Sequence, residues 1–157
     1  MKVKGDNSAL LSLRPFVMLI KREGANMAQL MTISEVQDRY KKEEDPFDLT
    51  IEKWVRIRDF LDTASTLSNF EELSQAANVA VPFCFEYQIK DCLGCPLEKT
   101  CCRGGGEKLL KVRRLIQIHA LAILAGNVLL KEPLISEVDG LLMELEMVKA
   151  KRRGLGH

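Results

Sequence analysis

All five cysteines of this chain of 157 residues lie in one short segment, at positions 84, 92, 95, 101 and 102. Cysteine thiolates bind zinc and iron–sulfur clusters, and four of them can complete either kind of centre. Taken as ligands, Cys84, Cys92, Cys95 and Cys101 have the spacing C-x7-C-x2-C-x5-C. Because Cys102 follows Cys101 directly, we expect only one of the two to bind and assign Cys101, with Cys102 as its substitute.

The central pair, Cys92 and Cys95, is separated by two residues, which lets both side chains point to the same side of a tight turn. Gly94 lies inside this pair and tolerates the positive φ that such a turn requires. Pro96 follows and prevents a helix from running back through the turn, because it has a fixed φ and no N–H donor. The segment therefore predicts a local pair of ligands that the two outer cysteines close from either side.

Three kinds of site fit these cysteines. A [4Fe–4S] cluster is favoured, because zinc knuckles more often contain two C-x2-C pairs and this segment has one pair with single flanking cysteines. Structural zinc is the first alternative. The second is no metal at all, with the cysteines in disulfides or as buried thiols. Disulfides would require secretion or a hyperthermophilic source, and the apolar run near the N-terminus lacks a cleavage site.

The cysteine segment resembles the iron–sulfur cluster loop of the endonuclease III and adenine-glycosylase family. That loop has the spacing C-x6-C-x2-C-x5-C, often with proline after the third cysteine, so this chain has one extra residue between Cys84 and Cys92. The resemblance covers residues 84–101 and implies that Cys84, Cys92, Cys95 and Cys101 ligate a [4Fe–4S] cluster. The family's helix-hairpin-helix and catalytic aspartate have no counterpart here. Glycosylase activity is therefore not implied, although a connection with nucleic acid is.

Charge is distributed unevenly along the chain, although the net charge is only +1. Residues 32–81 hold six basic and eleven acidic side chains, for a net charge of −5, whereas residues 107–157 hold nine basic and six acidic, for +3. The C-terminal half is thus the better candidate to contact phosphate groups, unless it is an ordinary solvated face. The candidate nucleic-acid contacts are Lys108, Lys111, Arg113, Arg114, Lys149, Lys151, Arg152 and Arg153.

The elements that would position these residues are helices. Ser34 opens a capping box, and Thr50 is expected to cap the next helix, in which Trp54, Ile57 and Leu61 form one apolar stripe. Helices are predicted at about 34–44, 51–64, 68–77, 83–90, 107–131 and 136–151. The prediction is an all-α single domain of five or six helices over residues 32–157, with the cysteine-rich loop 84–102 inserted before the longest helix.

That longest helix becomes apolar nearly all round between Leu115 and Leu130, which predicts the central buried helix of the fold. The run is too short and too often interrupted by polar residues to span a membrane, so no membrane partner is expected. Glu132-Pro133 should end the helix. His119 is expected to be a core residue rather than a ligand.

Residues 1–31 are predicted to be an N-terminal extension. Lys21 to Gly24 can be encoded by an uninterrupted purine run that contains GGAGG, two codons before Met27. Such a run is typical of a translated ribosome-binding site, so we expect Met27 to be the natural start and the source to be a prokaryote or one of its viruses.

The composition is that of an ordinary globular protein, and the chain contains no convincing catalytic constellation. The sequence therefore predicts a small, cytoplasmic, non-enzymatic metal-cluster protein, holding iron–sulfur or zinc, whose partner is nucleic acid or a nucleic-acid enzyme. A redox or electron-transfer iron–sulfur protein is the alternative from a different class. A disulfide-stapled structural or viral protein without metal is the third.

Overall fold

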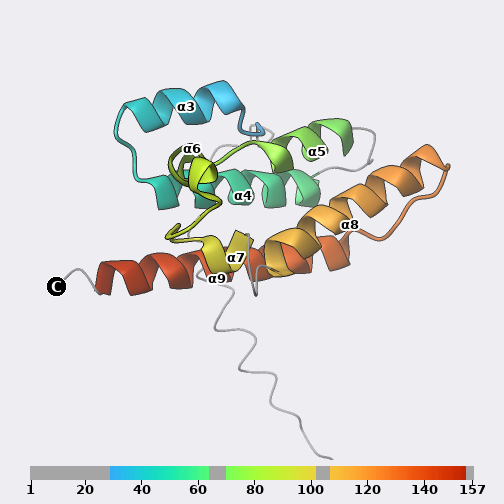
Figure 1. Ribbon diagram of the computed structural model, residues 1–157. Helices are drawn as coiled ribbons and strands as arrows, with labels where there is room; N and C mark the ends of the chain where they lie inside the picture. The colour runs from blue at the N-terminus through green and yellow to red at the C-terminus, as the bar shows by residue number, and fades with distance from the viewer. Residues whose placement is uncertain (1–28, 64–69, 102–106, 155–157) are drawn as a thin grey trace, which may run out of the picture.

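The computed structural model describes residues 29–63, 70–101 and 107–154, and these residues form helices and no strands. The α-helices are α3 (Ile33–Lys41), α4 (Pro46–Thr63), α5 (Phe70–Asn78), α6 (Pro82–Tyr87), α7 (Glu98–Cys101), α8 (Glu107–Leu124) and α9 (Glu132–Gly154), with a 3-10 turn η2 (Gln88–Lys90) after α6. The all-α prediction is confirmed (Figure 1). The described residues hold one helix more than expected, because α7 forms inside the predicted cysteine loop.

Helix α4 begins earlier than predicted. Asp45 caps it, since its carboxylate oxygen Oδ1 accepts hydrogen bonds from the backbone N–H groups of Phe47 (2.8 Å) and Asp48 (3.2 Å). Pro46 takes the first helical position, where a missing N–H costs nothing. The prediction that Thr50 caps this helix is wrong: Thr50 is buried within α4 and donates its hydroxyl to the Pro46 carbonyl (2.7 Å).

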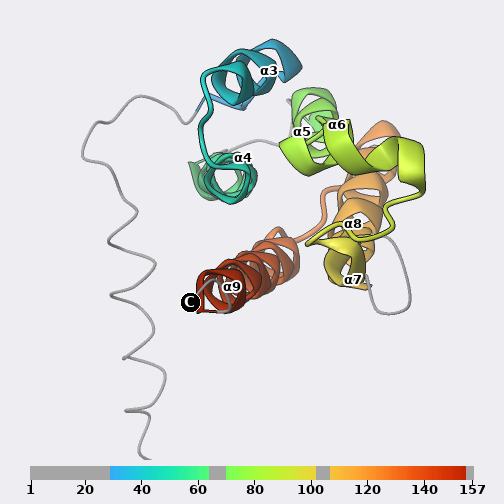
Figure 2. The ribbon, with the colours of Figure 1, turned by 60° about the vertical axis from the view of Figure 1, so that its left-hand side comes forward.

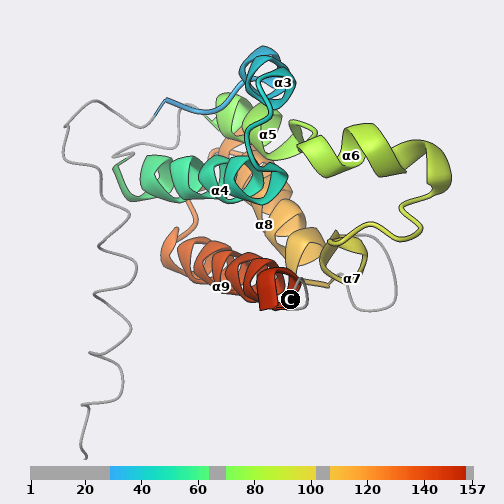
Figure 3. The ribbon, with the colours of Figure 1, turned by 90° about the vertical axis from the view of Figure 1, so that its left-hand side faces the viewer.

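The hydrophobic core is centred on α4. Trp54, Ile57 and Leu61 are all almost fully buried, which confirms the predicted apolar stripe. Helix α4 lies between α3 on one side and α9 on the other, as Figures 2 and 3 both show. Within the described residues, Met31 is also buried, so the end of the predicted N-terminal extension packs onto the domain. The predicted start at Met27 and the beginning of the helix expected at 68–77 lie outside the described residues.

Helices α8 and α9 form a hairpin whose boundaries differ from the prediction. Gly126 adopts a positive φ of 78° and closes α8 early: its N–H donates to the Ile123 carbonyl (2.9 Å), and the Asn127 N–H donates to the Ala122 carbonyl (2.8 Å). This pair of bonds is the Schellman arrangement, which ends a helix at a glycine. Pro133 lies in the first turn of α9 and so begins that helix instead of ending α8.

The prediction that α8 is the central buried helix is wrong. Only one stripe of it is buried, represented by Val112 and Ile116, whereas Leu121 and Leu124 are 65% and 84% exposed. His119 lies on the buried stripe, as expected of a core residue, and its ring stacks on that of Phe70 with the centroids 5.4 Å apart. Its Nδ1 atom has no hydrogen-bond partner among residues 29–63, 70–101 and 107–154, and burial lowers its pKa.

Helix α3 is held on α4 by a network of ion pairs. Glu52 of α4 accepts hydrogen bonds from Arg39 of α3 (2.7 Å) and from Arg56 (2.6 Å), and Arg56 also contacts Glu35 (2.8 Å). Glu44 adds a further carboxylate to Arg39 at 2.7 Å. Charge-assisted bonds of this kind are stronger than neutral ones, so the network sets how α3 is seated.

Replacing Glu52 by glutamine is expected to lower the free energy of unfolding at pH 7 by about 1–2 kcal/mol, because two guanidinium groups lose a shared partner. Hydrogen bonding, first from Arg39 and then from Arg56, lowers the pKa of Glu52 from its ordinary 4.5 to about 2. The stabilisation is therefore complete above pH 4.5 and is lost as the pH falls through about 2. Urea unfolding across this window should show wild type and variant converging.

The control for this prediction is Asp38→Asn. Asp38 pairs with Lys41 at 3.9 Å, and both side chains are more than two-thirds exposed. Such pairs contribute little, so this variant should unfold like the wild type at every pH. If Glu52→Gln and Asp38→Asn lowered the free energy of unfolding equally, a specific role for Glu52 in the network would be contradicted.

Candidate metal centre

The first candidate ligand, Cys84, lies on α6. Pro82 begins this short helix, as predicted, and the Cys84 N–H donates to the Val81 carbonyl (2.8 Å). Phe83 anchors α6 in the core through an edge-to-face contact with Phe47, with the ring centroids 4.8 Å apart. Cys84 itself is half-buried and packs against the hydrophobic core. It is therefore held by a rigid element.

The second and third candidates, Cys92 and Cys95, stand at the two ends of a tight turn. The Cys95 N–H donates to the Cys92 carbonyl (3.1 Å), and Gly94 between them has a φ of 76°. This confirms the bend that the sequence assigned to Gly94; open space surrounds the glycine, so the dihedral angle alone accounts for it. Cys92 itself has a positive φ of 62°, which is uncommon for cysteine and marks a tightly constrained turn.

The turn continues directly into α7, which carries Cys101. The backbone N–H of Leu97 donates to the Cys95 thiol, and Leu97 itself is buried. The Cys101 N–H donates to the Leu97 carbonyl (2.8 Å), so Cys101 is one helical turn away. Thr100 is buried and donates its hydroxyl to Glu144 of α9 (2.9 Å). The cysteine segment is therefore largely helical, and the predicted inserted loop is confined to the residues between η2 and α7.

The cysteines influence one another electrostatically. Burial raises the pKa of the Cys95 thiol, and Cys92 and Cys84 raise it further. Cys101 and Cys84 both lie near Lys53 of α4. The structure thus brings the four candidates to one side of the core. Among the described residues, however, no three cysteine, histidine, aspartate or glutamate side chains converge closely enough to hold a metal ion as they stand. Cys102 lies outside the described residues.

A buried lysine adjoins the cysteines. Lys53 is 2% exposed and donates to the carbonyls of Ala77 (2.9 Å) and Val79 (2.7 Å). Its Nζ atom lies 4.8 Å from the centre of the Trp54 ring. Burial lowers the pKa of Lys53 to about 7, and the nearby Arg113 lowers it too, whereas Cys84 and Cys101 raise it.

The nearby arginine is also enclosed. Arg113 of α8 is half-buried, and its buried Nε atom has no hydrogen-bond partner in the part of the chain that the structure describes. Among the described residues, neither Arg113 nor Lys53 forms an ion pair with a carboxylate. Arg113, predicted to contact nucleic acid, is thus partly enclosed, and the sequence does not predict a site role for Lys53. The sequence does contain an indication that Lys53 is buried: it lies four residues before Ile57 and so falls on the apolar stripe of α4.

The other predicted basic contacts fall into two groups. Four of them pair with acidic side chains: Lys108 with Glu144 (3.6 Å), Lys111 with Glu137 (2.5 Å), and Lys149 and Arg153 with Asp48, the latter at 4.0 Å. Arg114, Lys151 and Arg152 are exposed. Part of the positive charge of α8 and α9 therefore serves to join helices, although Lys108, Lys111 and Arg153 stay at least half exposed while they do so.

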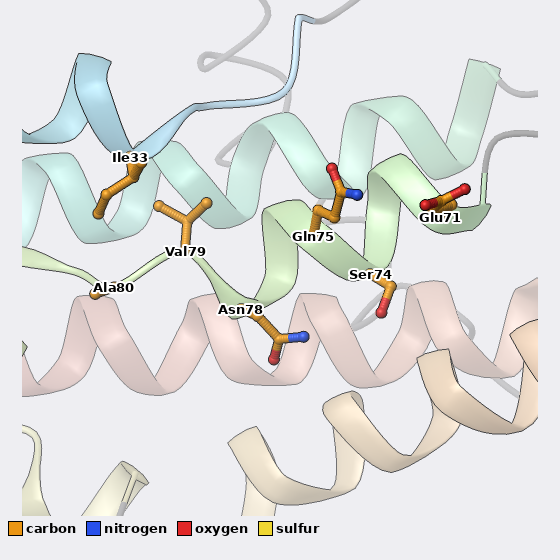
Figure 4. Close-up of a pocket in the computed structure, with 7 residues that line it drawn as sticks. All are labelled: Ile33, Glu71, Ser74, Gln75, Asn78, Val79 and Ala80. Atoms are coloured by element: carbon orange, nitrogen blue, oxygen red, sulfur yellow. The ribbon is translucent and has the colours of Figure 1, made fainter.

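A shallow groove of about 690 Å³ lies elsewhere, between the start of α3 and helix α5 (Figure 4). Its lining combines short polar with apolar side chains: Ile33, Glu71, Ser74, Gln75, Asn78, Val79 and Ala80. None of the candidate ligands or basic contacts lines this groove.

Within the part of the chain that the structure describes, no helix has the length and apolar character to cross a membrane. No protein-family model matches the chain, and comparison with curated proteins and with solved structures finds no match either.

Proposed function

We propose that this chain is a small, non-enzymatic protein organised around a thiolate-ligated metal centre held by Cys84, Cys92, Cys95 and Cys101. A [4Fe–4S] cluster is the first candidate for the centre and zinc the second. Its role is structural: it fixes the segment from α6 to α7 onto the core. Metal binding then contributes directly to folding, because only the folded chain gathers the four thiolates.

The observation that carries this proposal is the pair of enclosed cations, Lys53 and Arg113. Burying positive charge without a counter-charge costs several kcal/mol, and the two cations also repel each other. The groups beside Lys53 that can supply negative charge are the thiols of Cys84 and Cys101. Four thiolates around Zn²⁺ or a [4Fe–4S]²⁺ core carry a net charge of two minus, which two cations balance. If the thiols were neutral, Arg113 and the protonated form of Lys53 would face no anion from these cysteines, and for Lys53 only the Ala77 and Val79 carbonyls and the Trp54 ring would offset the charge.

The backbone around Cys95 supports the same conclusion. The N–H of Leu97 donates to the Cys95 sulfur, and this bond stabilises a thiolate more than a thiol, but burial outweighs it and raises the pKa of Cys95 in the metal-free chain. The positive φ of Cys92 costs free energy, as is frequent at ligand-binding sites, whereas Gly94 accepts its positive φ freely. We propose that the metal draws this turn and Cys101 together with Cys84 and so offsets that cost.

A redox role is the second candidate, and one observation favours it. Two enclosed cations beside an iron–sulfur cluster would stabilise the additional electron of the reduced state and so raise its reduction potential. Nucleic acid, or an enzyme that acts on it, is retained as the proposed partner. The exposed basic side chains of Arg114, Lys151 and Arg152 support that choice.

Metal analysis after anaerobic purification tests the proposal. We expect about four iron and four sulfide per chain, or about one zinc, and a lower melting temperature after chelation. Cys92→Ser should abolish the metal, whereas Cys102→Ser should leave it in place if Cys101 is the fourth ligand. A metal-free protein whose melting is unaffected by chelators would refute the proposal, as would a mass under non-reducing conditions that shows bridged thiols.

A further inference from the structure

Helix α8 presents a regular stripe of side chains to solvent. The stripe consists of Leu110, Arg114, Gln117, Leu121 and Leu124, which recur at alternating intervals of four and three residues. All five are exposed; Leu110 is 46%, Leu121 65% and Leu124 84% accessible. This spacing is the heptad pattern by which one helix packs along another. Leucines placed in this way and left in water are a recognised sign of a missing partner.

The remaining sides of α8 are already engaged. Val112 and Ile116 face the core, and Lys108 and Lys111 reach across to acidic residues of α9. Helices α5, α7 and α9 all contact α8, and the exposure of the stripe shows that these three helices leave it uncovered. It ends close to the connection between α8 and α9, which lies at one end of the molecule (Figure 1).

The apolar surface extends beyond the stripe itself. Ile118 on α8 is 50% exposed, and Val128 and Leu130 in the connection to α9 are 81% and 78% exposed. No residue between Leu115 and Leu130 carries a formal charge, apart from the titratable His119. Together these side chains offer an apolar area on the order of several hundred Å², comparable to the largest patch on a typical monomer, and such a patch is often an interaction surface. Such an area approaches one side of an ordinary protein interface, which is about 800 Å².

We propose that a second copy of this chain covers the stripe, with the two α8 helices packed antiparallel about a two-fold axis. Leu110 and Leu124 each lie seven residues from Gln117, and Arg114 and Leu121 lie three and four residues from it. An antiparallel arrangement therefore aligns the stripe with itself to within one residue. Leu110 of one copy then lies opposite Leu124 of the other, and Arg114 lies within one residue of the position opposite Leu121. The Gln117 side chains of the two copies meet at the axis, where their amides can hydrogen-bond to each other.

The charge distribution along α8 selects the antiparallel orientation. The basic side chains of this helix all lie in its N-terminal half: Lys108, Lys111, Arg113 and Arg114. A parallel pair would set these groups against their own copies, at a cost for each like-charged contact. The antiparallel pair instead sets them against the uncharged C-terminal half of the partner helix, whose end carries a partial negative charge. This inference uses no cysteine and does not depend on the metal centre.

The first test exploits the residue at the axis. Sedimentation of the wild-type chain should show a dimer with a dissociation constant in the micromolar range. Gln117→Glu and Gln117→Lys each place like charges together and should each weaken the dimer about tenfold or more. An equimolar mixture of the two variants should restore association to the wild-type level. Because each variant changes only an exposed side chain, circular dichroism should show the helical content unaltered.

A second mixture tests the orientation. The mixture contains two single variants, Leu110→Lys and Leu124→Glu. Their opposite charges meet across the interface only if the two α8 helices are antiparallel. Their mixture should therefore associate more tightly than either variant alone. The control is the pair Met143→Lys with Met147→Lys, on exposed methionines of α9, which should dimerise like the wild type.

Three results would overturn the proposal. They are a wild-type chain that stays monomeric at about 100 µM, a Gln117 mixture that fails to recover association, and a dimer that the α9 control disrupts instead. Recovery in the Gln117 mixture without tightening in the Leu110 and Leu124 mixture would point to a parallel dimer and would likewise overturn it.

Discussion

Cys95→Ser is expected to abolish metal binding and to lower the free energy of unfolding of the metal-loaded protein by at least about 3 kcal/mol. The physical reason is linkage: a structural metal binds only the folded chain, so much of its binding free energy is folding free energy. Cys95 is the cysteine most closely tied to the others, since Cys92 and Cys84 both influence its ionisation and Leu97 donates to its sulfur.

The apo protein provides the internal comparison for this variant. After chelation, Cys95→Ser should cost less than about 1 kcal/mol, because it then exchanges one half-buried polar group for another of similar size. Urea unfolding of the wild type and of Cys95→Ser, each with and without metal, would measure the two losses in the free energy of unfolding. Cys102→Ser is the matched cysteine control. Equal losses with and without metal would mean that Cys95 contributes only through packing.

Lys53→Met is expected to weaken metal binding while leaving the stability of the apo protein nearly unchanged. An ordinary core substitution would instead destabilise the apo protein as well. In the metal-loaded protein the variant should bind metal about 10- to 100-fold more weakly, the usual cost of losing a group that supports metal ligands without touching the metal. We propose that Lys53 and Arg113 together balance the net charge of the metal and its four thiolates. Metal binding is weaker in the variant because one of these two cations is absent.

The apo form of the same variant should be nearly as stable as the wild type, within about 1 kcal/mol. Methionine has a similar length and relieves the burial of a cation, which offsets the loss of hydrogen bonds to the carbonyls of Ala77 and Val79. Competition against a chelator of known affinity measures the first effect, and urea unfolding of the apo protein measures the second. Lys90→Met, on an exposed lysine of η2, should change neither. Unaltered metal affinity in the Lys53 variant would show that the charge of Lys53 does not stabilise the metal centre.

Much of the candidate site follows from local rules and could be predicted. The Cys92–Cys95 turn depends on a glycine that accepts positive φ, and the start of α6 depends on Pro82, both of which are properties of neighbouring residues. The termination of α8 was equally local: Gly126 is the glycine at which a Schellman motif closes the helix. The apolar run continues to Leu130 and therefore predicts a longer helix than the one that Gly126 ends.

Cap positions were predicted less well, because several residues compete for them. Ser34 has the capping-box pattern, yet Thr32 caps α3, accepting a hydrogen bond at its hydroxyl from the Glu35 N–H (3.2 Å). Asp45 in the same way replaces Thr50 at α4, since an aspartate followed by proline starts that helix one turn earlier. Sequence patterns identify a capping side chain only when it is the first one available.

The sequence by itself determined that the chain is helical, that one face of α4 is buried, and that the cysteines flank a tight turn. These features depend on contacts within three or four residues and on the φ angles of single residues, which residue type alone can specify. The tertiary structure alone decided that one stripe of α8 stays uncovered and that Lys53 meets Arg113 beside the cysteines. It also decided that Lys149 pairs with Asp48, a residue 101 positions earlier. Such outcomes depend on which helices pack together, and the free energy of that packing is shared among elements far apart in the chain.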